Sequence, residues 1–171
     1  MKKLLLSLLC AVFFVGGAFA SDEGHPDREF LTGSGFEFVK VNDVLVGTFN
    51  LIPIWAEKAC GDHIKGFYKV GKDVKEFSVI IKDGKLTGTF GKRVIVVEGV
   101  DPQKKEITLT SGGNKFIFKY NNGGTNGAHL VNLQFDFQGI DQNNYNVTLD
   151  GECCLGSVMF YSVFITGVTS L

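Results

Sequence analysis

His-Leu-Val-Asn-Leu-Gln-Phe-Asp-Phe-Gln-Gly, residues 129–139, is the stretch that decides the fold class. From Val131 to Gln138 its apolar and polar side chains alternate, so apolar residues recur with a period of two. That period is typical of a β-strand with one buried face and one face in water. The stretch therefore predicts a sheet with one face against a core.

The dipeptide Asp83-Gly84 predicts how two strands upstream of this stretch pair. It is a strong signal for a type I′ turn, in which both central residues have positive φ. A two-residue loop there sets apolar residues of the two strands opposite each other: Ile81 and Leu86, Val79 and Gly88, Phe77 and Phe90. Because all three pairs fall on one face, turn chemistry and hydrophobic pattern predict the same register.

Gly112-Gly113 gives a second hairpin by the same argument. Its two-residue loop places Leu109 opposite Phe116 and Ile107 opposite Phe118 on one face. A third connection, at residues 141–144, must leave an odd number of loop residues, three or five. Only then do Phe135 and Phe137 share a face with Tyr145, Val147 and Leu149.

The remaining strand candidates are residues 36–41, 45–54, 65–70, 93–100 and 157–168. No segment of ten or more residues shows a convincing helical period, and residues 55–63 are the only plausible helical turn. The chain after residue 20 is rich in Phe, Val, Thr, Gly and Asn and poor in Ala, Met and Arg, as expected for strands and turns. The sequence predicts an all-β fold: an antiparallel meander of eight to ten strands closing into a barrel, or alternatively a β-sandwich.

The N-terminus predicts export. Lys2 and Lys3 precede a short apolar run that ends in Ala18-Phe19-Ala20, the arrangement of a bacterial-type signal peptide cleaved after residue 20. The run is short for a membrane anchor, and Leu9 before Cys10 does not suit a lipoprotein. We expect residues 1–20 to be removed, residues 21–35 to form a flexible leader and residues 36–171 to form one domain. The expected location is the periplasm or the exterior.

Charge and length restrict the partners of the exported chain. Removal of 20 from 171 residues leaves 151, enough for one domain with a core. The two lysines of the signal leave with it, so 15 cations and 18 carboxylates give a net charge of −3. That balance argues against nucleic acid as a partner. No membrane span is expected in the mature chain, because the hairpin arms of six to eight residues are short even for an outer-membrane barrel.

The pattern Leu-x-Gly-Thr-Phe occurs twice, at residues 45–49 and 86–90. Glycine inside a strand permits a sharp bend or a close backbone approach. Gly47-Thr48-Phe49 in an early strand, followed by Gly-rich hairpins, resembles the opening strand of lipocalin-like (calycin) barrels, which usually carry Gly-x-Trp there. This resemblance covers residues 44–168 in pattern but rests on three residues. It implies a barrel with an apolar interior suited to a small ligand.

Cys60, Cys153 and Cys154 remain after removal of the signal. In an oxidising compartment the expectation is a disulfide from Cys60 to Cys153 or Cys154, with one thiol left over. The alternatives are unpaired cysteines or a metal site, because Cys60-x-x-His63 with Cys153-Cys154 and a nearby Asp62 has zinc-like chemistry. The adjacency of the two cysteines is unusual for metal ligands, so we expect no metal.

No catalytic motif is present. The sequence contains no Gly-x-Ser-x-Gly, no His-Glu-x-x-His and no phosphate-binding loop, and its three histidines are scattered. We expect no cofactor and name no catalytic residue, which leaves enzymatic activity uncertain and less favoured than binding.

The favoured function is therefore an exported binding module for an apolar or amphipathic ligand. Its expected lining consists of inward-facing residues of the barrel: Phe77, Val79, Phe90, Phe116, Phe118, Phe135 and Phe137. The alternative is a protein-interaction module, either an inhibitor or a structural component of the bacterial envelope. Its contact patch would combine the polar loop at 121–127 with Trp55 and neighbouring aromatics.

Overall fold

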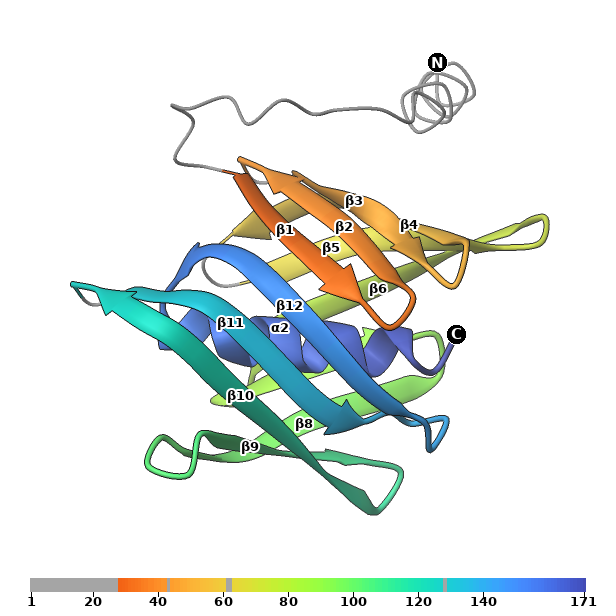
Figure 1. The fold of residues 1–171 in the computed structure, drawn as a ribbon. Helices are drawn as coiled ribbons and strands as arrows, with labels where there is room; N and C mark the ends of the chain where they lie inside the picture. The colour runs from red at the N-terminus through yellow and green to blue at the C-terminus, as the bar shows by residue number, and fades with distance from the viewer. Residues whose placement is uncertain (1–27, 43, 61–62, 128) are drawn as a thin grey trace.

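A computed structural model of the protein describes residues 28–42, 44–60, 63–127 and 129–171, with side chains except at positions 57–60 and 63. Twelve antiparallel strands close into a barrel around one helix (Figure 1). The strands are β1 (Arg28–Gly33), β2 (Phe36–Val41), β3 (Val44–Phe49), β4 (Ile52–Cys60), β5 (His63–Val70), β6 (Asp73–Lys82), β7 (Lys85–Phe90), β8 (Arg93–Asp101), β9 (Glu106–Ser111), β10 (Asn114–Asn126), β11 (His129–Gln138) and β12 (Asn144–Cys153). The helix is α2 (Leu155–Val168).

The strands follow one another around the ring in chain order, and β1 closes the ring by pairing with β12. The predicted all-β barrel is confirmed, whereas the alternative of a sandwich is not. The barrel has more strands than the expected eight to ten for two reasons. Arg28–Gly33, assigned to the flexible leader, forms β1, and residues 45–54, predicted as one strand, are divided between β3 and β4 by the turn at Asn50-Leu51. Residues 55–60, assigned to a helical turn, belong to β4. The predicted signal peptide lies outside the described residues.

The registers predicted from turn chemistry are confirmed. Around Asp83-Gly84, both with positive φ, Ile81 pairs with Leu86 and Phe77 with Phe90. Around Gly112-Gly113 the structure contains the predicted pairs of Leu109 with Phe116 and Ile107 with Phe118. The turn between β11 and β12 spans residues 139–143, the five-residue option, and so pairs Phe137 with Tyr145.

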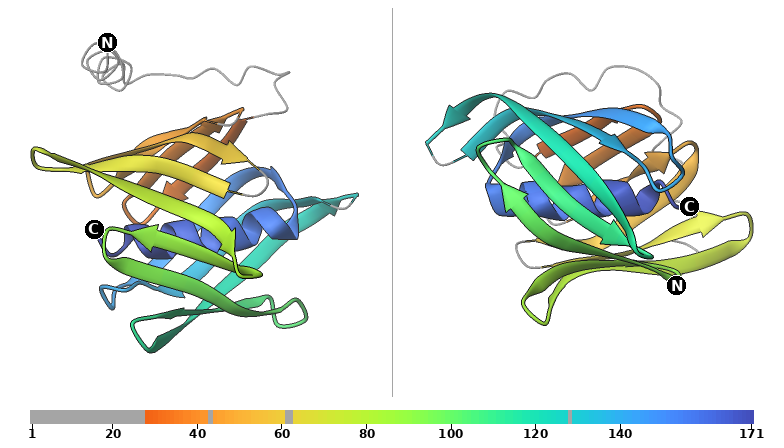
Figure 2. Two further views of the ribbon diagram at one scale, coloured as in Figure 1. Left: turned by 180° about the vertical axis from the view of Figure 1, so that it is seen from behind. Right: turned by 90° about the horizontal axis from the view of Figure 1, so that it is seen from below.

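The predicted strand at 157–168 is wrong, because this segment forms most of α2. The helix runs through the inside of the barrel, as the two views of Figure 2 show. Its residues from Tyr161 to Val168 are all buried, so it has no polar face and no helical period in its sequence. Its many β-branched and aromatic residues favour a strand locally. A closed barrel offers no free edge, so a segment inside it must satisfy its own backbone hydrogen bonds, as a helix does.

The helix lies closest to β7, and two glycines permit this approach. Gly88 on β7 faces Val163 of α2, and a Cβ at position 88 would overlap the Cγ1 of that valine. Gly167 of α2 lies against the ring of Phe90, and a Cβ there would overlap the ring. The second Leu-x-Gly-Thr-Phe copy thus supplies both contacts with the helix: Gly88, which leaves room for Val163, and Phe90, which packs on Gly167. In both copies the Leu, Gly and Phe point inward.

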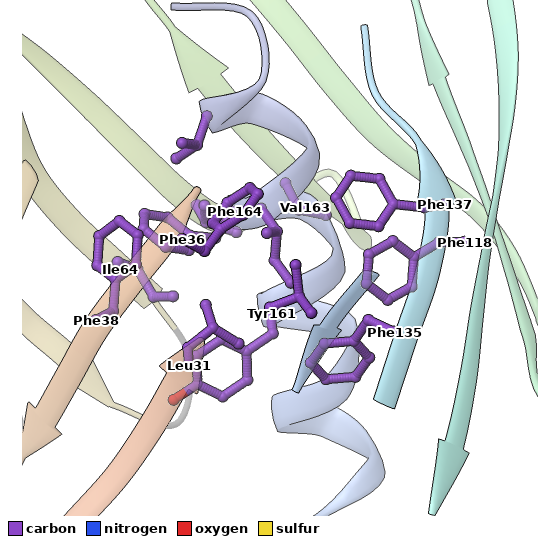
Figure 3. Packing of buried hydrophobic residues seen from close by; sticks show 14 of the residues in the cluster. Leu31, Phe36, Phe38, Ile64, Phe118, Phe135, Phe137, Tyr161, Val163 and Phe164 are labelled. Atoms are coloured by element: carbon purple, nitrogen blue, oxygen red, sulfur yellow. The ribbon is translucent and has the colours of Figure 1, made fainter. Parts of the chain in front are cut away.

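Aromatic side chains fill the space between α2 and the barrel wall. Phe164 lies 5.4 Å from Phe38 and 5.5 Å from Phe77, measured between ring centroids. Across the helix, Phe118 packs on Phe135 at 5.2 Å. Figure 3 shows α2 between Phe38 on one side and Phe118 and Phe135 on the other. The helix is therefore part of the core and not an addition to it.

Candidate functional site

The end of the barrel at which α2 begins carries the features that can support chemistry or binding. We call it the proximal mouth; it is bounded by the end of β12, the start of α2 and the turns β2–β3, β4–β5, β6–β7, β8–β9 and β10–β11. The opposite end, where α2 finishes, is called the distal end. There the hydroxyl of Thr169 accepts a hydrogen bond from the backbone N–H of Ile140 at 2.9 Å, which fixes the end of the helix.

A polar cluster lies inside the proximal mouth. Glu29 on β1 and Lys40 on β2 are cross-strand partners whose side chains form an ion pair at 2.8 Å. Tyr161 of α2 donates a hydrogen bond from its hydroxyl to the other carboxylate oxygen of Glu29. Burial, together with the charge of Glu29, raises the pKa of Tyr161 well above its usual value, so this phenol stays protonated and remains a donor. The cluster therefore links the central helix to the wall.

Two residues shape the surroundings of this cluster. Gly151 on β12 leaves room for Glu29, since a Cβ there would lie 2.9 Å from the Cγ of the glutamate. Cys153, at the end of β12, is buried beside the cluster. Burial and the negative charge of Glu29 raise the pKa of the Cys153 thiol to about 12. This thiol is neutral at physiological pH and therefore unreactive.

Cys154 has the opposite environment. It is exposed, immediately precedes α2, and its Sγ lies 3.5 Å from the hydroxyl of Ser157. Hydrogen bonds from the Ser157 hydroxyl and from backbone N–H groups of the first helical turn lower the pKa of the Cys154 thiol. Two adjacent cysteines thus differ strongly in thiolate content, because one faces the core and the other faces the N-terminus of a helix.

This contrast gives a testable expectation for the two thiols. In a Cys60→Ser protein treated with iodoacetamide, Cys154 should be alkylated in the native state and Cys153 only after unfolding. The pH midpoint of the Cys154 reaction should lie below that of a free cysteine, because its pKa is lowered. Peptide mass spectrometry before and after denaturation measures both sites. Equal native labelling of the two cysteines would contradict the assignment.

An open pocket of about 320 Å³ lies in the proximal mouth between α2 and the β6–β8 wall. Met159 and Phe160 of α2 form one side of it. The wall contributes Ile81, Gly84, Lys85, Leu86, Val97, Glu98 and Gly99. Most of these side chains are apolar, and the volume lies at the lower end of the range for small-ligand sites.

One ion pair borders this pocket. Lys85 Nζ lies 2.6 Å from a carboxylate oxygen of Glu98, and the Thr110 hydroxyl donates to the other oxygen at 3.2 Å. These two hydrogen bonds lower the pKa of Glu98, which is therefore ionised at neutral pH. The pocket thus combines an apolar surface with one positive and one negative group at its edge.

The residues predicted to line a ligand cavity are brought together, but as core. Phe77, Val79, Phe90, Phe116, Phe118, Phe135 and Phe137 are all at most 7% exposed and belong to one cluster with α2. Phe77 and Phe90, for example, stack on each other at 5.2 Å, and both pack near Phe164 of the helix. The helix α2 fills the space between these side chains, where a ligand cavity was predicted.

Among the described side chains no disulfide is found, and Cys153 and Cys154 are free thiols, so the predicted bridge to Cys60 is not shown. The backbone of Cys60 lies at the end of β4, four places from β12 around the ring. Neighbouring strands are about 4.8 Å apart, whereas a disulfide needs Cα atoms within about 7 Å. The side chains of Cys60, Asp62 and His63, named for the alternative metal site, lie outside the described residues. Among the residues that are described, no group of three or more metal-binding side chains is found.

The patch predicted for a protein partner is not formed as one surface. Residues 121–126 belong to β10 and not to a loop, while Trp55 lies on β4, six places away in the ring of twelve. Trp55 instead packs on Phe67 of β5 at 5.8 Å. Of the scattered histidines, His129 lies 3.6 Å from Glu152 at the surface.

Sequence reasoning missed Glu29, Lys40, Tyr161 and the pocket residue Met159. Glu29 was hidden in a stretch interpreted as a leader, and Tyr161 and Met159 in one interpreted as a strand. The only available signal was Lys40, a cation at an inward position of the alternating segment Phe36–Val41. Such a charge in a predicted core requires a partner, which the sequence does not locate.

The structure defines a closed twelve-stranded antiparallel barrel with a central helix and an apolar pocket at one mouth. Such a barrel is compatible with the calycin-like resemblance. No known protein family, curated protein or solved structure matches this chain. Within the described ranges, no helix has the length and apolar character needed to cross a bilayer.

Proposed function

We propose that this protein is an exported, lipocalin-like binding module that holds an apolar or amphipathic ligand at the proximal mouth of its barrel. The observation that carries this proposal is the pocket between α2 and the β6–β8 wall, with Met159 and Phe160 on one side. Methionine is flexible and adapts to ligands of different shape. The signal-like residues 1–20 support an exported location in the periplasm or outside the cell.

The proposed ligand site differs from that of a hollow barrel. Because α2 occupies the interior, the ligand binds beside the first half of the helix and not between the strands of the wall. An apolar group of the ligand contacts Leu86, Val97 and Phe160, while a polar group remains near Lys85 and Glu98. This arrangement suits a molecule with one apolar end and one polar end.

A matched pair of variants tests the pocket. Ile81 lines it and is 60% exposed, whereas its neighbour Ile80 points away from it and is 38% exposed. Both sites tolerate a charge without disturbing the core. With the fluorescent apolar probe N-phenyl-1-naphthylamine, we expect Ile81→Lys to weaken binding at least tenfold, because an apolar contact of about 1.5 kcal/mol or more is lost. Ile80→Lys should bind like the unmodified protein.

Two outcomes would count against this function. The first is probe binding that both lysine variants weaken equally, which would show a surface effect unrelated to the pocket. The second is an absence of binding by a folded protein. Native mass spectrometry of protein purified without detergent complements the probe, because a retained small molecule would appear as added mass. Ile81→Lys should reduce the fraction of the protein that carries this molecule.

A protein-interaction function is the second candidate, and one observation favours it. Five apolar side chains form a continuous row across the outer faces of β1–β5: Phe30, Val39, Val46, Trp55 and Phe67. All five are half-buried. Replacement of Val46 by Asp should abolish recovery of a bound envelope protein, while Ile80→Asp should not. If neither change matters, this candidate fails.

A further inference from the structure

Three neighbouring turns at the distal end form a surface that neither proposed function uses. They are the β3–β4, β5–β6 and β7–β8 turns. β4 pairs with β5 through Ile54 and Tyr68, which places the first two turns side by side. The third turn is adjacent, since a Cβ at Gly91 would lie 3.2 Å from the hydroxyl of Tyr68. We call residues 50–53, 69–76 and 91–94 the distal tip.

The distal tip exposes large apolar side chains to water. Leu51 is 90% exposed, Val74 50%, Val94 47% and Val70 41%. They come from three different turns, so the exposure is a property of the tip and not of one strand. Apolar groups gathered at an exposed end commonly mark a contact surface.

The backbone at Leu51 strengthens this argument. Asn50 and Leu51 have φ values of 46° and 68°, the positive values of a type I′ turn. Glycine is favoured at the second position, and a bulky side chain there is strained. The leucine does not repay this strain by packing in the described structure, since it is almost fully exposed. A strained, exposed apolar residue points to a contact outside the chain.

The charges of the distal tip identify the kind of contact. The distal tip contains five cations and two carboxylates, so it carries a net charge of +3, whereas the complete chain carries −1. The cations are Lys69, Lys72, Lys75, Lys92 and Arg93, and the carboxylates are Asp73 and Glu76. Among the described residues, none of these five cations forms an ion pair with a carboxylate. The positive charge is therefore available to an external anion.

We propose that the distal tip docks on the surface of a lipid bilayer that contains anionic phospholipid. Leu51 and the exposed valines enter the headgroup region, and the lysines and Arg93 pair with lipid phosphates. Exposed apolar groups surrounded by cations are the combination that binds such an interface. A soluble polyanion would use the cations but would gain nothing from Leu51.

The single tryptophan makes the test direct. Trp55 is the only tryptophan of the chain and lies on β4, the strand that follows the Leu51 turn. Energy transfer from Trp55 to dansyl-phosphatidylethanolamine therefore reports docking of the mature protein on vesicles. We expect transfer with vesicles in which phosphatidylglycerol replaces part of the phosphatidylcholine, and a loss of transfer as salt is raised. Vesicles of phosphatidylcholine alone should give little transfer.

Two sets of variants separate the distal tip from general charge. Lys72→Glu/Lys92→Glu should weaken vesicle binding at least tenfold, since each cation near an anionic membrane contributes several-fold. Lys104→Glu/Lys119→Glu makes the same change in net charge at two exposed lysines away from the tip and should retain most binding. Leu51→Gly should weaken binding several-fold and yet raise the melting temperature, because glycine relieves the positive φ. Loss of binding by that variant cannot then be attributed to unfolding.

Three results would overturn the proposal. One is no transfer with anionic vesicles, and another is an equal loss in both double variants, which would show diffuse electrostatics. The third is full binding by Leu51→Gly together with complete competition by dextran sulfate, which would identify a polyanion site instead. Probe binding at the proximal mouth should be unchanged in all these variants, so this proposal and the ligand site can fail independently.

Discussion

A chain that ends at Cys154 should fail to form a stable barrel, because it lacks the central helix. Truncation removes six buried apolar residues, Val158, Tyr161, Val163, Phe164, Ile165 and Val168. It also exposes the aromatic rings of the wall to water and deprives Glu29 and Lys40 of Tyr161. Each buried apolar side chain contributes about 1.5–3 kcal/mol, so the six together contribute about 9–18 kcal/mol. The usual free energy of unfolding of a domain is only about 5–15 kcal/mol.

Size-exclusion chromatography and circular dichroism during denaturation measure this outcome. We expect aggregates or an expanded chain without a cooperative transition. Phe164→Ala is the milder comparison: it should keep the fold and lower the free energy of unfolding by about 3–5 kcal/mol, since it leaves a cavity beside Phe38 and Phe77. A monomeric truncated chain that unfolds cooperatively would show that the barrel does not depend on α2.

Gly88→Ala is the second change with a large expected effect. A Cβ at position 88 overlaps Val163 Cγ1 and lies 3.2 Å from Cε2 of Phe90, so helix and strand must separate. We expect a loss of about 2 kcal/mol in the free energy of unfolding, because overpacking a rigid core costs about 1–3 kcal/mol. Gly88→Val should cost more, although valine is the better strand residue.

Gly99→Ala is the matched control for this change. Gly99 also lies in a strand, β8, but a Cβ there meets nothing within 4 Å. Its free energy of unfolding should change by no more than about 0.5 kcal/mol. Urea denaturation of both variants gives the comparison. If Gly88→Ala were as stable as Gly99→Ala, the close approach of α2 to β7 would not be present in solution.

The barrel wall was predictable because its determinants are local. The turn residues Asp83-Gly84 fix the pairing of Phe77 with Phe90, and Gly112-Gly113 fix that of Ile107 with Phe118. The alternation in residues 129–139 likewise assigns Phe135 and Phe137 to the inside. Turn chemistry and the two-residue period act over a few neighbouring residues, so one sequence suffices to interpret them.

The candidate site was harder to predict from the sequence, because its residues come from distant positions in the chain. Glu29 and Tyr161 are 132 positions apart and meet only when β1 closes the ring and α2 fills it. The pocket joins Met159 of the helix to Ile81 and Val97 of the wall in the same way. No local spacing relates such residues, so the sequence predicted an apolar interior but neither the polar cluster nor the pocket.

The sequence by itself determined the β class, the registers of the Asp83-Gly84 and Gly112-Gly113 hairpins and the inward apolar side chains of those strands. Only the tertiary structure decided that twelve strands close the ring and that Leu155–Val168 is a helix. Closure depends on the pairing of Leu31 with Leu149, which are far apart in the sequence but adjacent in the barrel. The helix depends on its surroundings: buried on every side, it shows no polar period, and inside a closed barrel only its own backbone can satisfy its N–H and C=O groups.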